Sequence, residues 1–187
     1  AIIAFSALAL FGTRHARAIT LYWDLNGTTA NVAGPVSGNW DGVTANWNTA
    51  SSGTGGTPQA GSTSADDLIF SSGALYTSGT ITLSGARVAS SISFEDNIAA
   101  TLSGGTSLTI GGTGAAGFDG IRVLAGNNSA NAISTALILA TATNTIQNAG
   151  TGVLTISGGI TGAQNLILQN NSTNAAGITI STGSLNN

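Results

Sequence analysis

Apolar residues recur in pairs two positions apart along most of this chain, and Gly, Asn or Ser residues separate the pairs. Each pair has the alternation of a short β-strand with one buried face. The pairs are Ile81/Leu83, Ile92/Phe94, Leu108/Ile110, Ile121/Val123, Leu137/Leu139, Leu154/Ile156, Leu166/Leu168 and Ile178/Ile180. Nothing after residue 18 carries apolar residues at helical spacing over three turns, so we expect almost no helix there.

This succession predicts an all-β solenoid, in which short strands stack as the rungs of a parallel β-helix. Turn residues such as Gly104-Gly105 and Asn127-Asn128 bound the pairs, and rungs of roughly 20–30 residues suit this pattern. We assign the solenoid to residues 71–187 and expect it to be incomplete at its C-terminal end. The polar residue inside each pair is expected to point outward, into polar ladders. Examples are Thr82, Ser93, Thr109, Thr155 and Thr179.

The region 19–70 differs because it contains all three tryptophans, Trp23, Trp40 and Trp47, between Gly/Ser/Thr-rich loops. The first rung of a solenoid exposes strand edges and apolar core that must be covered. We therefore predict a Trp-rich N-terminal cap. The alternative is that the three rings form a platform on which surface glycans stack, but buried aromatics are the commoner arrangement.

The first 18 residues have the pattern of an export signal. Residues 1–12 form an apolar run, and Ala16-Arg17-Ala18 puts small residues before a cleavage point at Ile19. The run is shorter than the ~20 apolar residues that span a bilayer. We predict a truncated signal peptide over residues 1–18 and an exported protein. Because the chain lacks an initiating Met and ends soon after a strand pair, we expect it to be a fragment.

The composition excludes several classes of function. Charged residues make up 6% of the chain, and the formal net charge is −3. With four arginines and no lysine, no basic stripe exists to neutralise phosphates, so we expect no nucleic-acid partner. The absence of cysteine excludes disulfides, thiolate nucleophiles and cysteine zinc clusters. The hydrophobic fraction of 42% argues against disorder.

Two glycine-rich or acidic motifs could in principle bind a ligand. Gly112-Thr-Gly114-Ala-Ala-Gly117 has the spacing of a dinucleotide loop, but a β-rich pair follows it where that site needs a helix. The same stretch with Asp119 resembles one imperfect copy of a calcium-binding nonapeptide, a motif that works in tandem copies. We therefore expect no cofactor and no metal.

The paired acids, Asp66-Asp67 and Glu95-Asp96, give no catalytic prediction. Adjacent side chains on a strand point to opposite faces, and in turns such acids serve as caps. An acid such as Asp119 or Glu95 could meet Arg87 or Arg122 in a polysaccharide-cleaving site, but nothing in the sequence requires this. We expect no catalytic residues.

The order of these elements resembles exported bacterial proteins with autotransporter-associated β-strand repeats. The resemblance rests on Trp23, Gly38-Asn-Trp40, Asn46-Trp47 and Asp66-Asp67-Leu-Ile-Phe70, followed by strands such as Leu154-Thr-Ile-Ser-Gly-Gly159. It implies a right-handed parallel β-helix, often the passenger of an autotransporter, that is exported to the bacterial cell surface, the outer membrane or the outside of the cell. The family has no agreed catalytic residues to transfer.

The sequence thus predicts a non-enzymatic, exported β-helix scaffold with a passenger-like or adhesin-like role. The alternative is a carbohydrate-binding protein, or a fragment of a β-helix enzyme that degrades polysaccharides. Partners would be surface glycans or other surface components. Membrane contact would come only through the signal segment or an anchor outside this sequence. An open strand edge near Ile178-Thr-Ile180 would also favour self-association.

Overall fold

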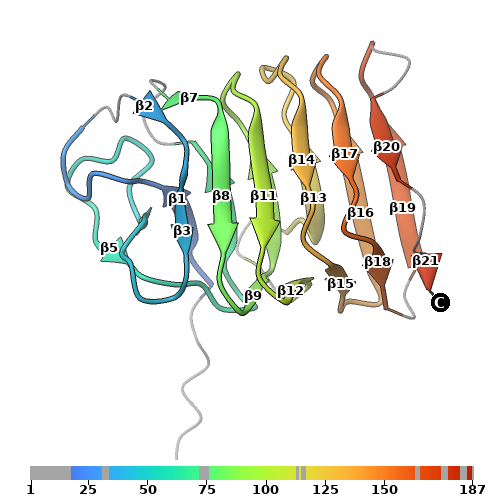
Figure 1. Cartoon of the computed structure of the whole chain (residues 1–187), viewed down its shortest axis with the longest axis horizontal. Helices are drawn as coiled ribbons and strands as arrows, with labels where there is room; N and C mark the ends of the chain where they lie inside the picture. The colour runs from blue at the N-terminus through green and yellow to red at the C-terminus, as the bar shows by residue number, and fades with distance from the viewer. Residues whose placement is uncertain are drawn as a thin grey trace, which may run out of the picture.

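The structure, a computed structural model, describes residues 18–30, 34–71, 76–112, 114, 117–162, 165–173, 177–181 and 185–186. In this part of the chain every regular element is a strand, and no helix occurs. Three sheets, here named A, C and D, contain nearly all of the strands, and their pairing is overwhelmingly parallel (Figure 1). The expectation of an all-β chain without helix is therefore confirmed for the described residues. Residues 1–17 of the predicted signal segment lie outside them.

Sheet A has eight strands in the order β19-β16-β13-β10-β6-β1-β4-β5. Their bounds are β1 Thr20–Trp23, β4 Trp47–Asn48, β5 Pro58–Gln59, β6 Asp67–Phe70, β10 Ser91–Phe94, β13 Gly120–Val123, β16 Thr143–Asn148 and β19 Asn165–Asn170. Pairing is antiparallel only at the N-terminal end, where β4 joins β1 and β5 joins β4.

Sheets C and D are wholly parallel, with strand orders β20-β17-β14-β11-β8-β3 and β21-β18-β15-β12-β9. Sheet C comprises β3 Gly38–Trp40, β8 Gly79–Leu83, β11 Ala100–Gly104, β14 Asn131–Ile133, β17 Leu154–Ile156 and β20 Ile178–Ile180. Sheet D comprises β9 Ala86–Ala89, β12 Ser107–Ile110, β15 Leu137–Leu139, β18 Ile160–Thr161 and β21 Leu185–Asn186. A short parallel pair joins β2 Gly34–Pro35 to β7 Tyr76–Thr77.

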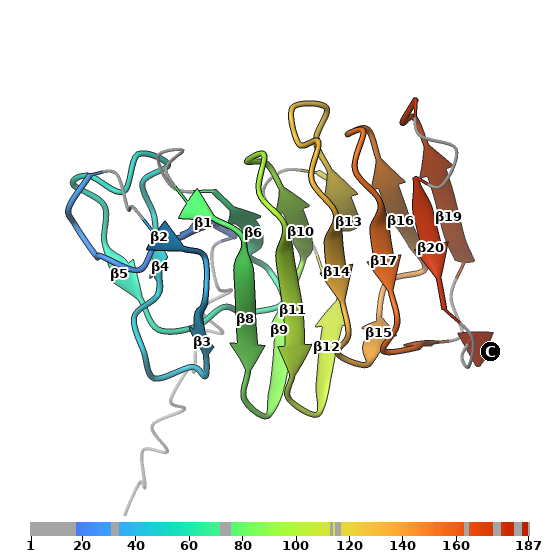
Figure 2. The ribbon, with the colours of Figure 1, turned by 45° about the horizontal axis from the view of Figure 1, so that its top comes forward.

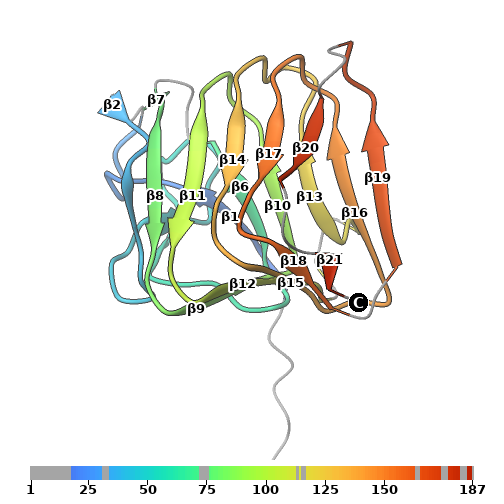
Figure 3. The same ribbon diagram turned by 45° about the vertical axis from the view of Figure 1, so that its right-hand side comes forward.

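From β8 onward the chain visits sheets C, D and A in a fixed order, and each strand pairs in parallel with the strand three places later. The successive partners in sheet C are Ile81, Leu102, Ile133, Ile156 and Ile180, so one cycle takes 21 to 31 residues. Figures 2 and 3 show the strands of each sheet side by side along the long axis of the molecule.

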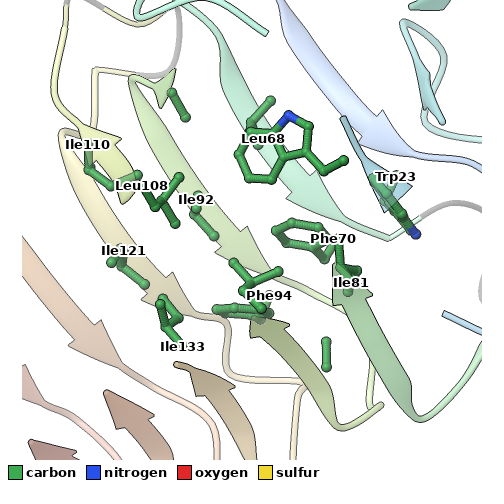
Figure 4. Close-up of a cluster of buried hydrophobic side chains, with 14 of the residues drawn as sticks. Trp23, Leu68, Phe70, Ile81, Ile92, Phe94, Leu108, Ile110, Ile121 and Ile133 are labelled. Carbon is green, nitrogen blue, oxygen red and sulfur yellow. The ribbon is translucent and has the colours of Figure 1, made fainter. Parts of the chain in front are cut away.

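The alternating pattern places one row of apolar side chains from each strand in a common interior (Figure 4). Completely or almost completely buried positions include Ile92, Phe94, Ile121, Val123 and Ile146 in sheet A, Ile81, Leu83, Leu102, Ile133, Leu154 and Ile156 in sheet C, and Leu108, Ile110, Leu137 and Leu139 in sheet D. Six of the eight sequence pairs thus contribute both members to the core. Burying a side chain of this size stabilises the fold by about 1.5–3 kcal/mol.

The last two pairs behave differently. Leu168 is paired with Ile146, which is 0% exposed, yet Leu168 itself is 52% exposed. Leu166, Ile178 and Ile180 are only partly buried. In the described residues no further strand pairs with β19 or β20 on their outer side, so these side chains have core neighbours on one side only.

The polar residue between the two members of each apolar pair was predicted to point outward. Of these residues, Thr82 and Thr179 are exposed, and Thr109 and Thr155 are half-buried. Ser93 differs from the prediction because it is buried. Its side chain faces away from the core, as expected, but the Arg122 Nε on the next strand donates a hydrogen bond to Ser93 Oγ at 2.7 Å. The Arg122 guanidinium also lies 4.9 Å from the Phe118 ring centroid, so these side chains cover the outer face locally.

The bend between sheets A and C depends on a buried amide. Asn148, at the end of β16, accepts a hydrogen bond from Gly150 N at 3.0 Å. Its Nδ2 donates to the carbonyls of Gly152, at 2.7 Å, and Gly177. Gly177 belongs to the following cycle, so the Asn148 side chain both stabilises the bend and links two successive cycles of the chain.

A close approach between strands explains the glycine that opens β13. Gly120 has φ 143°, and a Cβ there would collide with the backbone of Thr145 on the next strand. Only glycine adopts this conformation without strain.

We expect Ile121→Ala to lower the free energy of unfolding by about 2–5 kcal/mol, because it leaves a cavity in the interior. Urea denaturation followed by circular dichroism measures the change. The control Thr82→Ala, at an exposed position, should stay within about 0.5 kcal/mol of wild type. Equal effects of the two variants would contradict the assignment of the interior row.

We expect Asn148→Ala to cost at least about 2 kcal/mol, since three buried backbone groups lose their partner. Asn171→Ala, at an exposed position in the equivalent bend of the next cycle, is the matched control and should be nearly neutral. The same denaturation assay applies, and an Asn148→Ala variant as stable as the control would exclude the role given to this amide.

Candidate functional sites

The three tryptophans lie together in the interior at the N-terminal end. Trp23 is 0% exposed, and Trp40 and Trp47 are each 1% exposed. The Trp23 and Trp47 ring centroids are 4.9 Å apart in an edge-to-face arrangement, and those of Trp40 and Trp47 are 5.3 Å apart. The rings have no open face on which a sugar could stack. This geometry speaks against the platform considered from the sequence.

Strand pairing brings the tryptophans together. Trp23 in β1 is the antiparallel partner of Trp47 in β4, and Trp40 in β3 is the parallel partner of Leu83 in β8. Phe70 continues the aromatic cluster at 5.9 Å from Trp23 and stacks on Phe94 at 5.5 Å. Each such aromatic pair adds about 0.5–1.5 kcal/mol beyond its buried area, so the cluster packs continuously onto the core of the parallel strands.

The cluster leaves two buried donors without a hydrogen bond. Trp23 Nε1 donates to the Val36 carbonyl at 2.9 Å. Trp40 Nε1 and Trp47 Nε1 are buried and have no hydrogen-bond partner in the described part of the chain. Both indoles lie in edge-to-face pairs, an arrangement in which the positive edge of one ring meets the negative face of another.

A buried carboxylate lies beside the tryptophans, and sequence reasoning missed it. Asp24 is 0% exposed; its Oδ1 accepts a hydrogen bond from Asn26 N at 3.1 Å, and its Oδ2 accepts one from Asn48 Nδ2 at 2.8 Å. Asn48 Nδ2 also donates to the carbonyl of Gly27. The sequence showed only the doublets Trp23-Asp24 and Trp47-Asn48. In the antiparallel register Asn48 lies opposite Tyr22 and therefore diagonally across from Asp24, so the contact follows only from the tertiary structure.

Tyr76 joins the same region through its hydroxyl. The hydroxyl donates to the Trp23 carbonyl at 3.2 Å and accepts from Leu25 N at 3.1 Å. Burial raises the pKa of Tyr76 above its ordinary value, and the nearby charges of Asp24 and Asp96 raise it further. The phenol therefore stays protonated and acts as a structural hydrogen-bond donor.

The adjacent acids Asp66 and Asp67 are both buried and point to different partners. Asp66 accepts hydrogen bonds from Thr63 N at 2.7 Å, Thr63 Oγ1 at 2.8 Å and Ile19 N at 3.2 Å, so it caps the turn before β6. Asp67 accepts a hydrogen bond from Ser91 Oγ on the neighbouring strand at 2.6 Å. These contacts match the capping role weighed for the doublet and form no acid/base pair.

The groups considered for a polysaccharide-cleaving site have separate partners. Arg122 is held by Ser93 and Phe118, as described above, while Asp119 accepts a hydrogen bond from Ser90 Oγ at 3.4 Å. Arg87 lies against Gly42, where an added Cβ would meet its guanidinium. Its Nε is buried without a hydrogen-bond partner in the described residues. These contacts bind loops to sheets and do not gather acids and arginines around one cleft.

The remaining motifs supply no ligand geometry. In the described residues, no three His, Cys, Asp or Glu side chains gather as a metal site requires. Gly112, Gly114 and Gly117 are followed by strand β13 and not by a helix, whereas residues 113, 115 and 116 lie outside the described part. Asp41 is half-buried, and hydrogen bonds from the backbone of Thr44 and Val43 lower its pKa to about 2. These bonds stabilise the turn after β3.

No helix in the described part of the chain is long and apolar enough to cross a membrane. Comparison of the chain with protein-family models, with curated proteins and with solved structures found no match.

Asp96 is a partly buried acid beside Glu95. Its Oδ2 is buried without a partner among the described residues. Burial raises its pKa, a hydrogen bond from Ser71 lowers it in part, and the neighbouring Glu95 charge raises it further. The ionised form is therefore disfavoured in the folded state.

We expect Asp96→Asn to stabilise the protein at pH 7. A raised folded-state pKa means that stability is lost as pH rises from the unfolded value of about 3.9 through the folded value. The variant should thus have a higher Tm than wild type at pH 7 and nearly the same Tm at pH 3. Thermal unfolding at both pH values tests this; a stabilisation that does not depend on pH would contradict the assigned cause.

Proposed function

We propose that this chain belongs to an exported, non-enzymatic scaffold built as a right-handed parallel β-helix. The observation that carries the proposal is the fixed register in which each strand pairs with the strand three places later, through sheets C, D and A. A chain that repeats this cycle around one apolar interior is a β-solenoid in architecture. Parallel crossover connections are right-handed in nearly all proteins, which supports the handedness.

The N-terminal region 19–70 is proposed as the cap of this solenoid. Trp23, Trp40 and Trp47 are buried against Phe70 and Leu83, the first members of the stacked rows in sheets A and C. The antiparallel strands β4 and β5 end sheet A on this side. A sheet edge finished in this way is a poor template for further parallel pairing.

The polar contacts support a scaffold rather than an enzyme. Asp24, Asp66, Asp67 and Asp119 accept hydrogen bonds that hold turns and strands, and Arg122 covers the outer face of sheet A. Catalytic sites instead bring groups of perturbed pKa together in a cleft. The proposed role is geometrical: each further rung extends the rod by about 4.8 Å and displays outward side chains at a constant spacing.

Export is proposed from residues 1–18, whose apolar run and Ala16-Arg17-Ala18 fit a signal peptide. The resemblance to proteins with autotransporter-associated β-strand repeats supports a passenger-like or adhesin-like location at the cell surface. The low charge suits an extended surface protein that does not attract polyions.

The test is to produce the chain, with an initiating Met, in a bacterium that has an outer membrane. We expect it to leave the cytoplasm and to be cleaved between Ala18 and Ile19, as mass spectrometry of the recovered protein would show. The Ala18→Arg variant should stay uncleaved, because a large residue at the last position before the cut is not accepted. An Ala7→Val variant, which keeps the apolar run, is the matched control.

Two results would contradict the proposal. One is an uncleaved chain that stays in the cytoplasm whichever variant is used. The other is a recovered protein whose far-UV circular dichroism is helical, or whose small-angle scattering fits a sphere rather than a rod.

A further inference from the structure

The outer face of sheet C has two straight rows of small polar side chains. The first row comprises Thr80, Thr101, Ala132, Thr155 and Thr179, which are successive partners in the parallel register. The second row comprises Thr82, Ser103, Ser134, Ser157 and Ser181, and the ladder bonds from Ser134 N, Ser157 N and Ser181 N to the strand before continue this register. Nine of these ten side chains carry a hydroxyl.

The spacing of the rows follows from sheet geometry. Successive strands lie about 4.8 Å apart, and the two rows are two residues, or about 6.6 Å, apart along each strand. The strands of the face lie side by side in Figures 1 and 2. The hydroxyls therefore form a two-dimensional lattice and not an isolated cluster.

This face is open and carries no charge. Each of the ten side chains is exposed or half-exposed, and none of the strands β8, β11, β14, β17 and β20 contains a charged residue. Sheets A and D differ. On sheet A, Arg122 and Phe118 cover the outer face locally, over Ser93. On sheet D, the outward row consists of Val88, Thr109, Ile138 and Thr161, so it mixes apolar and hydroxyl side chains.

The chemistry of the face selects its partner. Without charge it gives no attraction to a polyion, and without exposed aromatic rings it gives no stacking. A single hydroxyl contact yields only about 0.5–1.5 kcal/mol after competition with water. Useful affinity therefore requires many simultaneous contacts with a partner that is itself uncharged, rich in hydroxyls, ordered and periodic. Linked contacts of this kind add up as avidity.

We propose that the outer face of sheet C binds an ordered, uncharged polysaccharide, whose chains lie along the two hydroxyl rows. The inference rests on the scaffold proposed above and deepens it by assigning a partner to one of its faces.

The experiment is a sedimentation binding assay with the purified full chain on two insoluble neutral polymers, microcrystalline cellulose and chitin. We expect saturable retention on at least one of them. The double variant Thr101→Glu/Thr155→Glu places charges in the first row that must be desolvated on docking, and it should bind at least tenfold more weakly. Thr109→Glu is the matched control, since Thr109 is equally half-buried but lies on sheet D; its binding should equal that of wild type.

Circular dichroism verifies that each variant is folded, and Ser157→Glu, at an exposed position of the second row, replaces the double variant if that one unfolds. Retention that is insensitive to substitutions in the rows, no retention on either polymer, or adsorption only to an anionic alginate gel or to ice would overturn the inference. A folded, exported chain without retention would leave the scaffold proposal standing. Retention by a chain that is never exported would support the binding face but contradict the proposed export.

Discussion

The parallel, in-register pairing of each strand with the strand three places later is the constraint on which the rest of this structure depends. Because side chains alternate across a strand, a slip of one residue would move every apolar row from the interior to the solvent. The pairs of apolar residues two positions apart prevent this slip, since Ile92, Ile121 and Ile146 stack only in one register. The same register also places the outward residues of successive strands in rows.

Buried polar groups are the second requirement of this architecture. Where the chain turns from one sheet to the next, its backbone groups leave the ladders and need other partners. Asn148 and Asn48 meet this need in the same way, each by accepting from the backbone two residues on and donating to nearby carbonyls. Asp24 and Asp66 have comparable roles near the N-terminal end. The scarce acids of the chain are thus largely structural.

The two ends and the three faces of the molecule differ in how completely they are covered. Aromatic rings and antiparallel strands close the N-terminal side, whereas Leu168 is exposed on the last strands described. Among the faces, Arg122 and Phe118 cover part of sheet A, the outward row of sheet D mixes apolar and hydroxyl side chains, and sheet C presents two open rows that are almost entirely hydroxyls. The outer face of sheet C is therefore neutral and rich in hydroxyls, and its period is that of the strands themselves.

The sequence by itself determined the strands that carry an apolar pair, because apolar alternation is a local property that can be read at Leu108/Ile110 or Leu154/Ile156 without knowledge of the neighbours. It did not predict strands without such a pair, such as β14 and β16. It also allowed a capping role for the Asp66-Asp67 doublet, and Asp66 has that role. Only the tertiary structure decided which outward residues are covered: Ser93 alternates like Thr109, yet Arg122 from the next strand buries it. It likewise decided that the tryptophans are enclosed and that Asp24 meets Asn48. The reason is that alternation defines a direction relative to one strand, while burial depends on segments that other parts of the chain bring across it.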